Sequence, residues 1–410
     1  MEIYRKNFLL NILLEGFCGL GSGFVVPATI LAIFLSTFTS SKILIGLLFA
    51  VPAIGTSLTP ILSAYYTAGL ARKKKLLVYL HLAYIICWLM LTMFVFLSDK
   101  LTPEGTLIAF FIIYGLSSFI IGFLIPPYLD YIGKIVPKGR GVFFGTAFAA
   151  SGGLAIIGAF LARRILSSIS FPENYGLCFF SASAFWLLSL LFLSLNIEVE
   201  GPPVSQRKKF GVYLRDLVKI LKEDKGYLRL IIVQMITSFG AMSSPFYAIY
   251  ASSQLQVTGS VLGYFTVMLL SGGMIASVLL GVLGDFFGHN ISLLIAVVCG
   301  IGSATIALFG SSVGHFYALF FLLGFSLAPT FMVCTNLVLE MATIEQRSSY
   351  LALNSTLVAP LAATAPLLGG FLIRTFSYSF VFSLTIAVLL VGLLVLIMET
   401  GKGRYRTRRG

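Results

Sequence analysis

The chain alternates between long apolar runs and short polar segments, apart from one long polar interval near its middle. The apolar runs have the length of membrane-spanning helices, about 20 residues each, and six precede the interval while six follow it. The predicted spans are residues 8–38, 43–68, 76–97, 106–129, 141–164, 175–195, 228–252, 261–283, 291–309, 315–339, 350–373 and 379–398. This pattern predicts an all-α membrane protein with twelve transmembrane helices.

The polar interval divides the chain into two halves. We expect residues 1–196 and 228–398 to form two six-helix bundles, joined by a linker over residues 197–227 and followed by a basic tail over residues 399–410. Within the linker, residues 210–222 repeat apolar positions near helical period, which predicts an amphipathic helix lying on the inner membrane leaflet. A solvated tether is the alternative.

Composition excludes a soluble protein, because 58% of residues are hydrophobic, 10% are charged and the mean hydropathy is +0.99. The net charge of +13 comes from basic residues gathered in the linker, in residues 72–75 and in the tail. Such clustering marks cytoplasmic segments. It predicts a multi-pass protein of the cell membrane with both termini in the cytoplasm. The protein is not expected to bind nucleic acid. The five cysteines lie in apolar runs without a C-x-x-C pair, so neither a disulfide nor a metal site is expected.

The two halves resemble each other at several places. Aligning their first spans brings Glu15 onto Gln234 and places Pro27 one position from Pro245. The outer ends of the fifth and eleventh spans also match, as residues 158–163 and 369–374 both begin with glycine and end with arginine. A repeat of this kind predicts two bundles of parallel topology, related by an axis along the membrane normal.

The loop between the eighth and ninth spans resembles the signature G-x-x-x-D-x-x-G-[RK] of the major facilitator superfamily, through Gly281, Gly284, Asp285 and Gly288. The glycines permit a tight turn and close helix contact. The resemblance implies the fold of that family and a cytoplasmic gate that rearranges during alternating access. The first half departs from the signature, because Ala68 stands where the aspartate is expected.

A second resemblance, to uncharacterised prokaryotic members of the superfamily, is carried by residues 336–340 with Glu340 at their end, by Arg347 and its following residues, and by residues 365–370. A related string around Arg140 lies in the first half. We expect Arg140 and Arg347 to hold helix ends or lipid headgroups, with a gate role as the alternative. This resemblance implies no particular substrate.

Among fifteen acidic residues, Glu15 alone lies well within a predicted span. A charge at the centre of a span costs about 2.5–3.5 kcal/mol on insertion scales, and an apolar site disfavours the charged form of a carboxyl group. Glu15 is therefore the candidate proton site. Asn11, one turn earlier, is its expected hydrogen-bond partner. A structural carboxyl near the inner surface is the alternative.

Substrate contacts are expected from polar residues of the first, fourth, seventh and tenth spans, which line the cavity in the superfamily by resemblance. Gln234, the repeat partner of Glu15, either contacts substrate or bridges helices. The further candidates are Ser22, Tyr114, Ser118, Ser238 and Thr330, for which helix packing is the alternative reading.

Other polar side chains have more ordinary expectations. His81 and His315 lie near span ends, where residence at the membrane interface is expected, and His289 is expected to be solvated. Arg163 at an outer end is expected to extend to the interface, with attraction of an anionic cargo as the alternative.

The first expectation for function is a monomeric secondary transporter of a small, largely apolar or weakly polar solute, working by proton-coupled efflux. Uptake or facilitated diffusion is an alternative, as is a membrane sensor or lipid-handling protein with the same fold. No catalytic or nucleotide-binding motif is found, so neither an enzyme nor a cofactor is expected.

Overall fold

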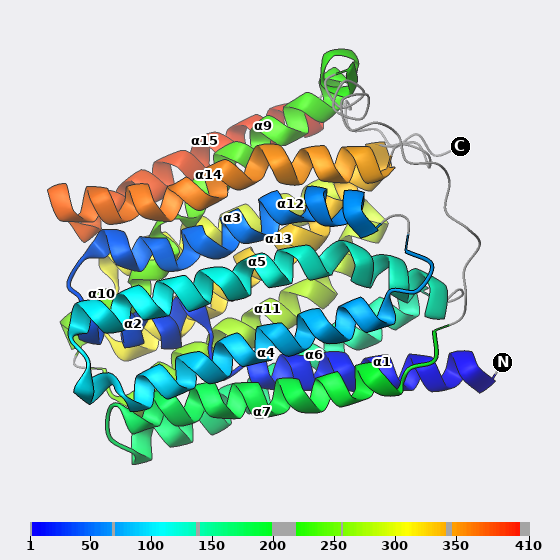
Figure 1. Ribbon diagram of the computed structural model, residues 1–410. Coiled ribbons are helices and arrows are strands. Elements are labelled where there is room, and N and C mark those ends of the chain that lie inside the picture. Colours follow the sequence, from blue (N-terminus) through cyan, green and yellow to red (C-terminus); the bar gives the residue numbers. More distant parts are fainter. Residues whose placement is uncertain are drawn as a thin grey trace. The chain divides into compact units, whose positions relative to one another are not determined.

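The computed structural model describes residues 2–67, 70–136, 140–198, 219–255, 257–341 and 347–401, and these residues are mostly helical (Figure 1). The first half contains α1 (Glu2–Ser22), η1 (Pro27–Leu31), α2 (Ala32–Phe38), α3 (Lys42–Thr67), α4 (Lys74–Phe96), η2 (Ser98–Lys100), α5 (Pro103–Ile135), α6 (Arg140–Ser168) and α7 (Glu173–Leu195). The second half contains α9 (Lys225–Phe239), η3 (Gly240–Phe246), α10 (Tyr247–Leu255), α11 (Gly259–Phe287), α12 (His289–Phe309), α13 (Val313–Met341), α14 (Arg347–Thr375) and α15 (Tyr378–Gly401).

Ten helical stretches of the described chain are long and apolar enough to cross a membrane. Two shorter apolar stretches, Lys42–Ser57 in α3 and Val313–Leu327 in α13, coincide with the second and tenth predicted spans. The architecture is therefore an all-α membrane fold, and its apolar helices are consistent with the twelve predicted spans.

The first span of each half is interrupted, whereas the sequence predicted continuous helices over residues 8–38 and 228–252. In the first half, α1 ends at Ser22 and the chain continues as a π-helix from Pro27. In the second half, α9 gives way to a 3-10 helix over Gly240–Phe246 that contains Pro245. Proline lacks the backbone donor that α-helical hydrogen bonding requires, which explains why both interruptions occur beside an aligned proline.

Helix α5 extends beyond the predicted residues 106–129 at both ends. Its start is fixed because the Thr102 side chain accepts a hydrogen bond from the Gly105 amide at 3.1 Å and Pro103 occupies the first turn, where no intrahelical donor is needed. At the other end, Pro126 and Pro127 lie inside the helix without ending it. Tyr128 and Asp130 are thereby held on the same rigid element.

The structure forms two compact units. Unit 1 consists of Met1–Ser40, Ile54–Arg207 and Val257–Val267, and unit 2 consists of Ser41–Ala53, Lys208–Gln256 and Met268–Gly410. Each sequence half thus contributes most of one unit. The first parts of α3 and α11 are the exceptions, since residues 41–53 belong to unit 2 and residues 257–267 to unit 1.

The core of unit 1 is rich in aromatic side chains. Helix α1 packs against α6 and α7, while α4 packs against α5 and α7, so these helices run side by side (Figure 1). Trp88 meets the Phe179 ring edge-on at 5.5 Å and lies 5.3 Å from Trp186, between ring centroids. Edge-to-face pairs of this kind suit the aromatic quadrupole.

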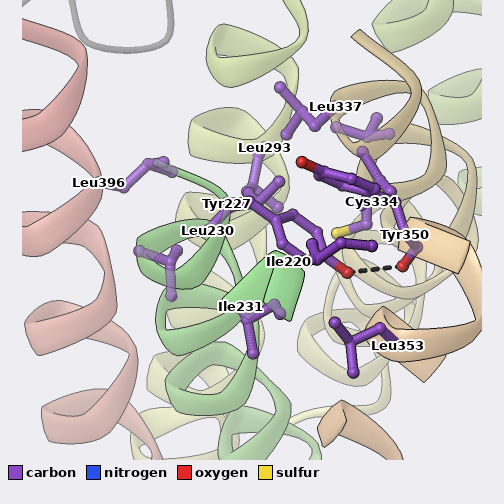
Figure 2. Packing of buried hydrophobic residues seen from close by; sticks show 13 residues of the cluster. Ile220, Tyr227, Leu230, Ile231, Leu293, Cys334, Leu337, Tyr350, Leu353 and Leu396 are labelled. Carbon is purple, nitrogen blue, oxygen red and sulfur yellow. Dashed lines mark hydrogen bonds between the residues drawn. The ribbon is translucent and has the colours of Figure 1, made fainter. Parts of the chain in front are cut away.

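Unit 2 has a core of aliphatic side chains around a tyrosine pair (Figure 2). Tyr227 of α9 and Tyr350 of α14 have ring centroids 4.4 Å apart, and the Tyr227 hydroxyl donates to the Tyr350 carbonyl oxygen at 2.5 Å. Leu230, Leu337 and Leu353 pack around the pair. The buried hydroxyl is thus satisfied, as a polar group in a bilayer must be.

Several predictions fall outside the described residues. They are most of the amphipathic helix predicted over residues 210–222, the tail beyond residue 401, and the departure at Ala68. The same holds for the side chains of Arg140, Asp285, Thr330, Glu340 and Arg347, although their backbones belong to α6, α11, α13, α13 and α14.

Candidate functional site

Glu15 lies on α1 and is held by a hydroxyl group. The Tyr128 hydroxyl of α5 donates to Glu15 Oε1 at 2.5 Å, within unit 1. Both side chains are half-buried. A neutral donor leaves the carboxyl group free to exist with or without a proton, whereas a lysine or arginine partner would fix it as an anion. The arrangement is therefore chemically suited to binding and releasing a proton.

Asn11 has a different role from the predicted one. It is fully buried, and its Nδ2 donates to the Asn7 carbonyl oxygen at 2.7 Å and to Asn196 Oδ1 at 2.9 Å, not to Glu15. Asn7 exchanges two hydrogen bonds with the Ile197 backbone, at 2.8 and 2.9 Å. The two asparagines thus connect α1 by hydrogen bonds to the end of α7 and to the first linker residue. Tyr128, not Asn11, is the partner of Glu15.

A second polar group lies one turn beyond Glu15. Cys18 Sγ is 3.1 Å from Ser189 Oγ, and Ser189 Oγ is 3.0 Å from His81 Nε2. His81 on α4 is only 8% exposed. His81 therefore faces α7 inside unit 1, where its ring has a hydroxyl partner. Residence at the depth of the membrane interface stays a prediction, whereas the burial of this face was not visible in the sequence.

The remaining candidates of unit 1 differ in exposure. Ser22 is exposed and donates to the Cys18 carbonyl oxygen at 2.9 Å. Tyr114 and Ser118 are buried, and the Ser118 hydroxyl donates to the Tyr114 carbonyl oxygen at 2.8 Å. The Tyr114 ring stacks on Phe110 with centroids 5.3 Å apart. In this structure these contacts of Tyr114 and Ser118 lie within α5, and contact of the two side chains with substrate stays a prediction.

Gln234, the repeat partner of Glu15, bridges two helices of unit 2. Asn354 Nδ2 of α14 donates to Gln234 Oε1 at 3.0 Å, and the Ser238 hydroxyl donates to the Gln234 carbonyl oxygen at 2.7 Å. Gln234 is 4% exposed. Its Nε2 and the Asn354 Oδ1 have no hydrogen-bond partner among the described residues. The position equivalent to the carboxyl group of unit 1 therefore holds an amide pair that cannot titrate.

The loop between α11 and α12 has the tight geometry that the glycines predicted. Gly288 is the sole residue between the helices and has φ +93°, a left-handed conformation that suits glycine. A Cβ at Gly284 would lie 2.7 Å from the His289 ring. Contrary to expectation, His289 is not solvated. It is 6% exposed, and its Nε2 lies 3.0 Å from Asn336 Nδ2 of α13.

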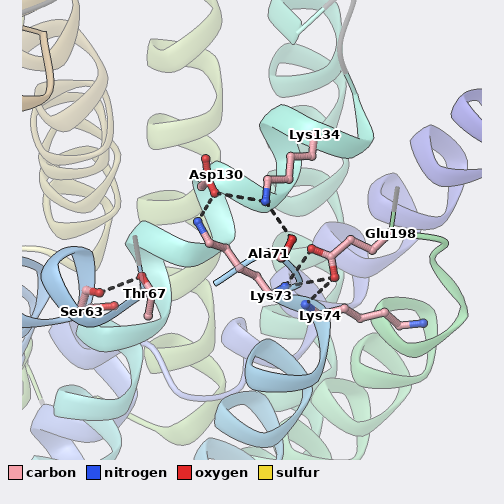
Figure 3. A network of polar contacts seen from close by, with 8 residues as sticks. All are labelled: Ser63, Thr67, Ala71, Lys73, Lys74, Asp130, Lys134 and Glu198. Atoms are coloured by element: carbon pink, nitrogen blue, oxygen red, sulfur yellow. Dashed lines mark hydrogen bonds and ion pairs between the residues drawn. The ribbon is translucent and has the colours of Figure 1, made fainter. Parts of the chain in front are cut away.

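A polar network in unit 1, between the start of α4 and the end of α5, was not predicted (Figure 3). The buried Lys73 ammonium group pairs with Asp130 near the end of α5, and Lys134, one turn later, lies 3.8 Å from the same carboxylate. Lys134 also donates to the Ala71 carbonyl oxygen at 3.3 Å. The half that lacks the signature aspartate thus has an ion pair of its own, with the acid on α5. The i, i+4 spacing of Asp130 and Lys134 was the available signal.

The first linker residues join this network through Glu198. Its carboxylate accepts from the Lys73 amide at 2.8 and 3.1 Å and from the Lys74 amide at 2.9 Å, so it caps the start of α4. Free amides at a helix N-terminus favour a carboxylate. In unit 2, Asp224 at the linker's other end caps α9 through the Tyr227 amide at 2.9 Å and accepts from the Tyr350 hydroxyl at 2.9 Å.

Arg163 on α6 has partners that the sequence did not predict. Its guanidinium carbon lies 4.5 Å from the centroid of the Tyr264 ring, and its Nη1 donates to Ser260 Oγ at 3.1 Å. Both partners are on the part of α11 that belongs to unit 1. The cation therefore packs on an aromatic face, and its extension to the membrane interface stays a prediction.

Comparison with known proteins identifies the fold. Residues 230–409 match the family model of the Major Facilitator Superfamily. The structure is similar to a point variant of the nucleoside transporter NupG, with a TM-score of 0.75 and 13% identity, covering 96% of this chain and 99% of that one. NupG without the substitution gives a TM-score of 0.69 and 14% identity, with coverages of 97% and 99%.

A bacterial homologue of the human lysosomal transporter Spinster, in an inward-facing and unoccupied conformation, is also similar. Its TM-score is 0.65 at 14% identity, with 98% of this chain and 96% of that chain covered. No curated protein sequence matches the chain. At these identities the solved structures establish the fold and not the cargo.

Proposed function

We propose that this chain is a proton-coupled secondary transporter of the major facilitator superfamily. Its residues 230–409 match the family model, and its fold is similar to that of a nucleoside transporter over 96% of the chain. The chain moves a small solute across the membrane by alternating access. The direction that we propose is proton-coupled export. We also propose that both termini lie in the cytoplasm, because basic residues beside the first span and in the tail favour that side of the membrane.

The observation that supports this proposal is the hydrogen bond between Glu15 and Tyr128. An ionised carboxyl group within a span costs about 2.5–3.5 kcal/mol on insertion scales. The free-energy effect of protonating Glu15 therefore differs between conformations that expose its carboxyl group to water and conformations that bury it. Conformations that hydrate Glu15 favour the anion, and those that enclose it favour the protonated acid. A proton bound on one side and released on the other then couples to the conformational cycle.

The cargo that fits the chain best is small and weakly polar. Inside the described spans, polar candidates such as Ser22 and Ser238 are neutral hydroxyls, and the amide pair of Gln234 and Asn354 is also uncharged. Uncharged donors and acceptors suit an uncharged solute. Because the fold is similar to a nucleoside transporter, nucleosides are the first class of solute that we would test.

The test is solute flux in proteoliposomes that contain a pH-sensitive dye. A panel of nucleosides and other small neutral metabolites is first screened by thermal shift at two pH values, and radiolabelled forms of the solutes that stabilise the protein are then assayed. We expect solute movement with the protein to carry protons in stoichiometric amount. Proton flux should be lost in Glu15→Gln and kept in Glu104→Gln, a matched change at an exposed carboxyl group at the start of α5.

Two results would overturn the proposal. Solute flux with an unchanged pH dependence in Glu15→Gln would remove Glu15 as the proton site while leaving transport intact. Solute-induced stabilisation without any flux would identify a sensor that keeps the fold, and the transport proposal would fail. Labelling of engineered cysteines from either side of intact cells tests the orientation separately.

A further inference from the structure

Unit 2 contains an apolar groove that has no part in the proton coupling proposed for Glu15. Its volume is about 480 Å³, and all eight lining residues are apolar. Three lining residues, Ile236, Phe239 and Met242, come from α9 and η3 and are here called the floor. The others are here called the walls and come from α14, through Leu368 alone, and from α15. A volume of this size is in the range of pockets that hold small ligands.

The groove borders η3, where the first span of unit 2 forms a 3-10 helix. Its side chains eclipse one another every third residue. Beside the groove, Gly240 lets Leu389 of α15 pack directly on η3, because a Cβ at that position would collide with the Leu389 side chain. Phe239 and Met242 flank the glycine and form the floor between the two walls.

The groove is continuous with the apolar outer surface of its walls. Leu368 of α14 is 40% exposed and Val391 of α15 is 51% exposed, and both belong to the lining. The wall residues Leu384 to Val391 cover about 10 Å of α15 at 1.5 Å per residue. Water is a poor occupant, because an apolar cavity without polar partners stays dry.

The depth of the groove in the membrane selects the occupant. The floor residues lie in the middle of the candidate span Lys225–Leu255, and the α15 wall lies in the middle of Tyr378–Met398. A charged or zwitterionic headgroup is excluded from that depth by the cost of its desolvation. A hydrocarbon chain can enter, and bilayer lipids present such chains at high local concentration.

We propose that this groove is a binding site for one acyl chain of a membrane phospholipid, seated between α14 and α15 against the 3-10 segment of the first span of unit 2. The site goes beyond the proposed transport activity and does not depend on it. The chain contacts Phe239 and Met242, the residues beside the helix interruption. A bound lipid would therefore contact the segment where this span departs from α-helical geometry.

The test counts lipids retained by the purified protein. Protein extracted from vesicles of dioleoyl-phosphatidylcholine is stripped with detergent and measured by native mass spectrometry. We expect the unmodified chain to retain one lipid after loosely bound lipid is gone. Val388→Trp, which fills the groove, should lose it. Leu394→Trp, on the same helix at a position that is 60% exposed and outside the lining, should keep it.

A second measurement needs no substitution and therefore does not depend on folding of a variant. Phosphatidylcholine with a diazirine in its acyl chain is photolysed in vesicles with the unmodified protein, and the labelled peptides are mapped. We expect label concentrated on residues 236–242 and 384–391. Label spread evenly over exposed apolar residues of all spans, or equal lipid retention by the chain and Val388→Trp, would overturn the proposal.

Discussion

Equivalent positions on the first helices of the two halves have been given different chemistry. In unit 1, Glu15 accepts a hydrogen bond from the Tyr128 hydroxyl, whereas in unit 2 Gln234 accepts one from the Asn354 amide. The carboxyl group can change its charge and the amide cannot. The comparison teaches that a repeat can retain a polar bridge between helices in both halves while only one half keeps a proton site.

The ends of the units that lie next to the linker differ in a parallel way. Unit 1 uses ions, since Lys73 pairs with Asp130 while Glu198 caps α4. Unit 2 uses a tyrosine pair, with Tyr350 donating to Asp224. In both units, however, a carboxylate at one end of the linker caps a transmembrane helix. The linker is thus fixed at both described ends by the same device in different surroundings.

The largest expected effect comes from exchanging the two side chains. In a protein carrying both Glu15→Gln and Gln234→Glu, we expect proton flux to remain absent, because a carboxyl group at position 234 faces an amide and not the Tyr128 hydroxyl. Dye-loaded proteoliposomes measure this, with Glu15→Gln alone as the reference. Recovery of proton flux in the double variant would show that the two positions are interchangeable and would break the comparison.

The next effect concerns stability in unit 2. Gln234→Leu removes the acceptor of Asn354 Nδ2 and leaves a buried amide group unpaired, which costs about 1–3 kcal/mol in the free energy of unfolding. Replacing Asn354 by leucine as well should recover part of that loss, since the interhelical bond itself contributes only about 0.6 kcal/mol on average in membrane proteins. Denaturation of the two single variants and the double variant provides the cycle. Equal stability of all four proteins would contradict the bridge.

A smaller effect is expected from the helix caps. Asp224→Ala removes the acceptor of the Tyr227 amide and of the Tyr350 hydroxyl, and Glu198→Ala removes the cap of α4. Each should lower the free energy of unfolding by about 0.5–2 kcal/mol. Glu223→Ala is the matched control, because Glu223 is 68% exposed and lies 3.8 Å from Lys219, an ion pair expected to contribute at most about 1 kcal/mol. A control that destabilises as much as Asp224→Ala would rule out capping as the cause.

The smallest effect is a displaced pH profile in Tyr128→Phe. The hydroxyl donor favours the charged carboxylate, so its removal should make protonation of Glu15 easier and shift the half-maximal point of coupled transport to higher pH. A hydrogen bond of about 0.5–1.5 kcal/mol corresponds to a shift of at most about one pH unit. Initial rates across a pH series measure it. A shift to lower pH would show that Tyr128 stabilises the protonated form instead.

Much of the architecture could be predicted from hydropathy because each span must satisfy its own backbone in lipid. The aligned prolines Pro27 and Pro245 were visible, yet the sequence predicted continuous helices where the structure has interruptions. The site was harder to predict. Glu15 was found because a carboxyl group in an apolar run is rare, whereas Tyr128 sits among many tyrosines and is more than 100 residues away in the chain. His289 was predicted to be solvated and is buried, because distance from a span end does not reveal which face of a helix is covered.

The sequence by itself determined where the apolar helices lie, the internal repeat and the single carboxyl group well within a predicted span. These properties follow from local composition, which decides whether a segment can reside in lipid. Only the tertiary structure decided that Tyr128 holds Glu15, that Asn354 holds Gln234, and that Asn11 faces α7. Those pairings depend on how helices distant in the chain turn toward one another, and side-chain packing across helices fixes that rotation.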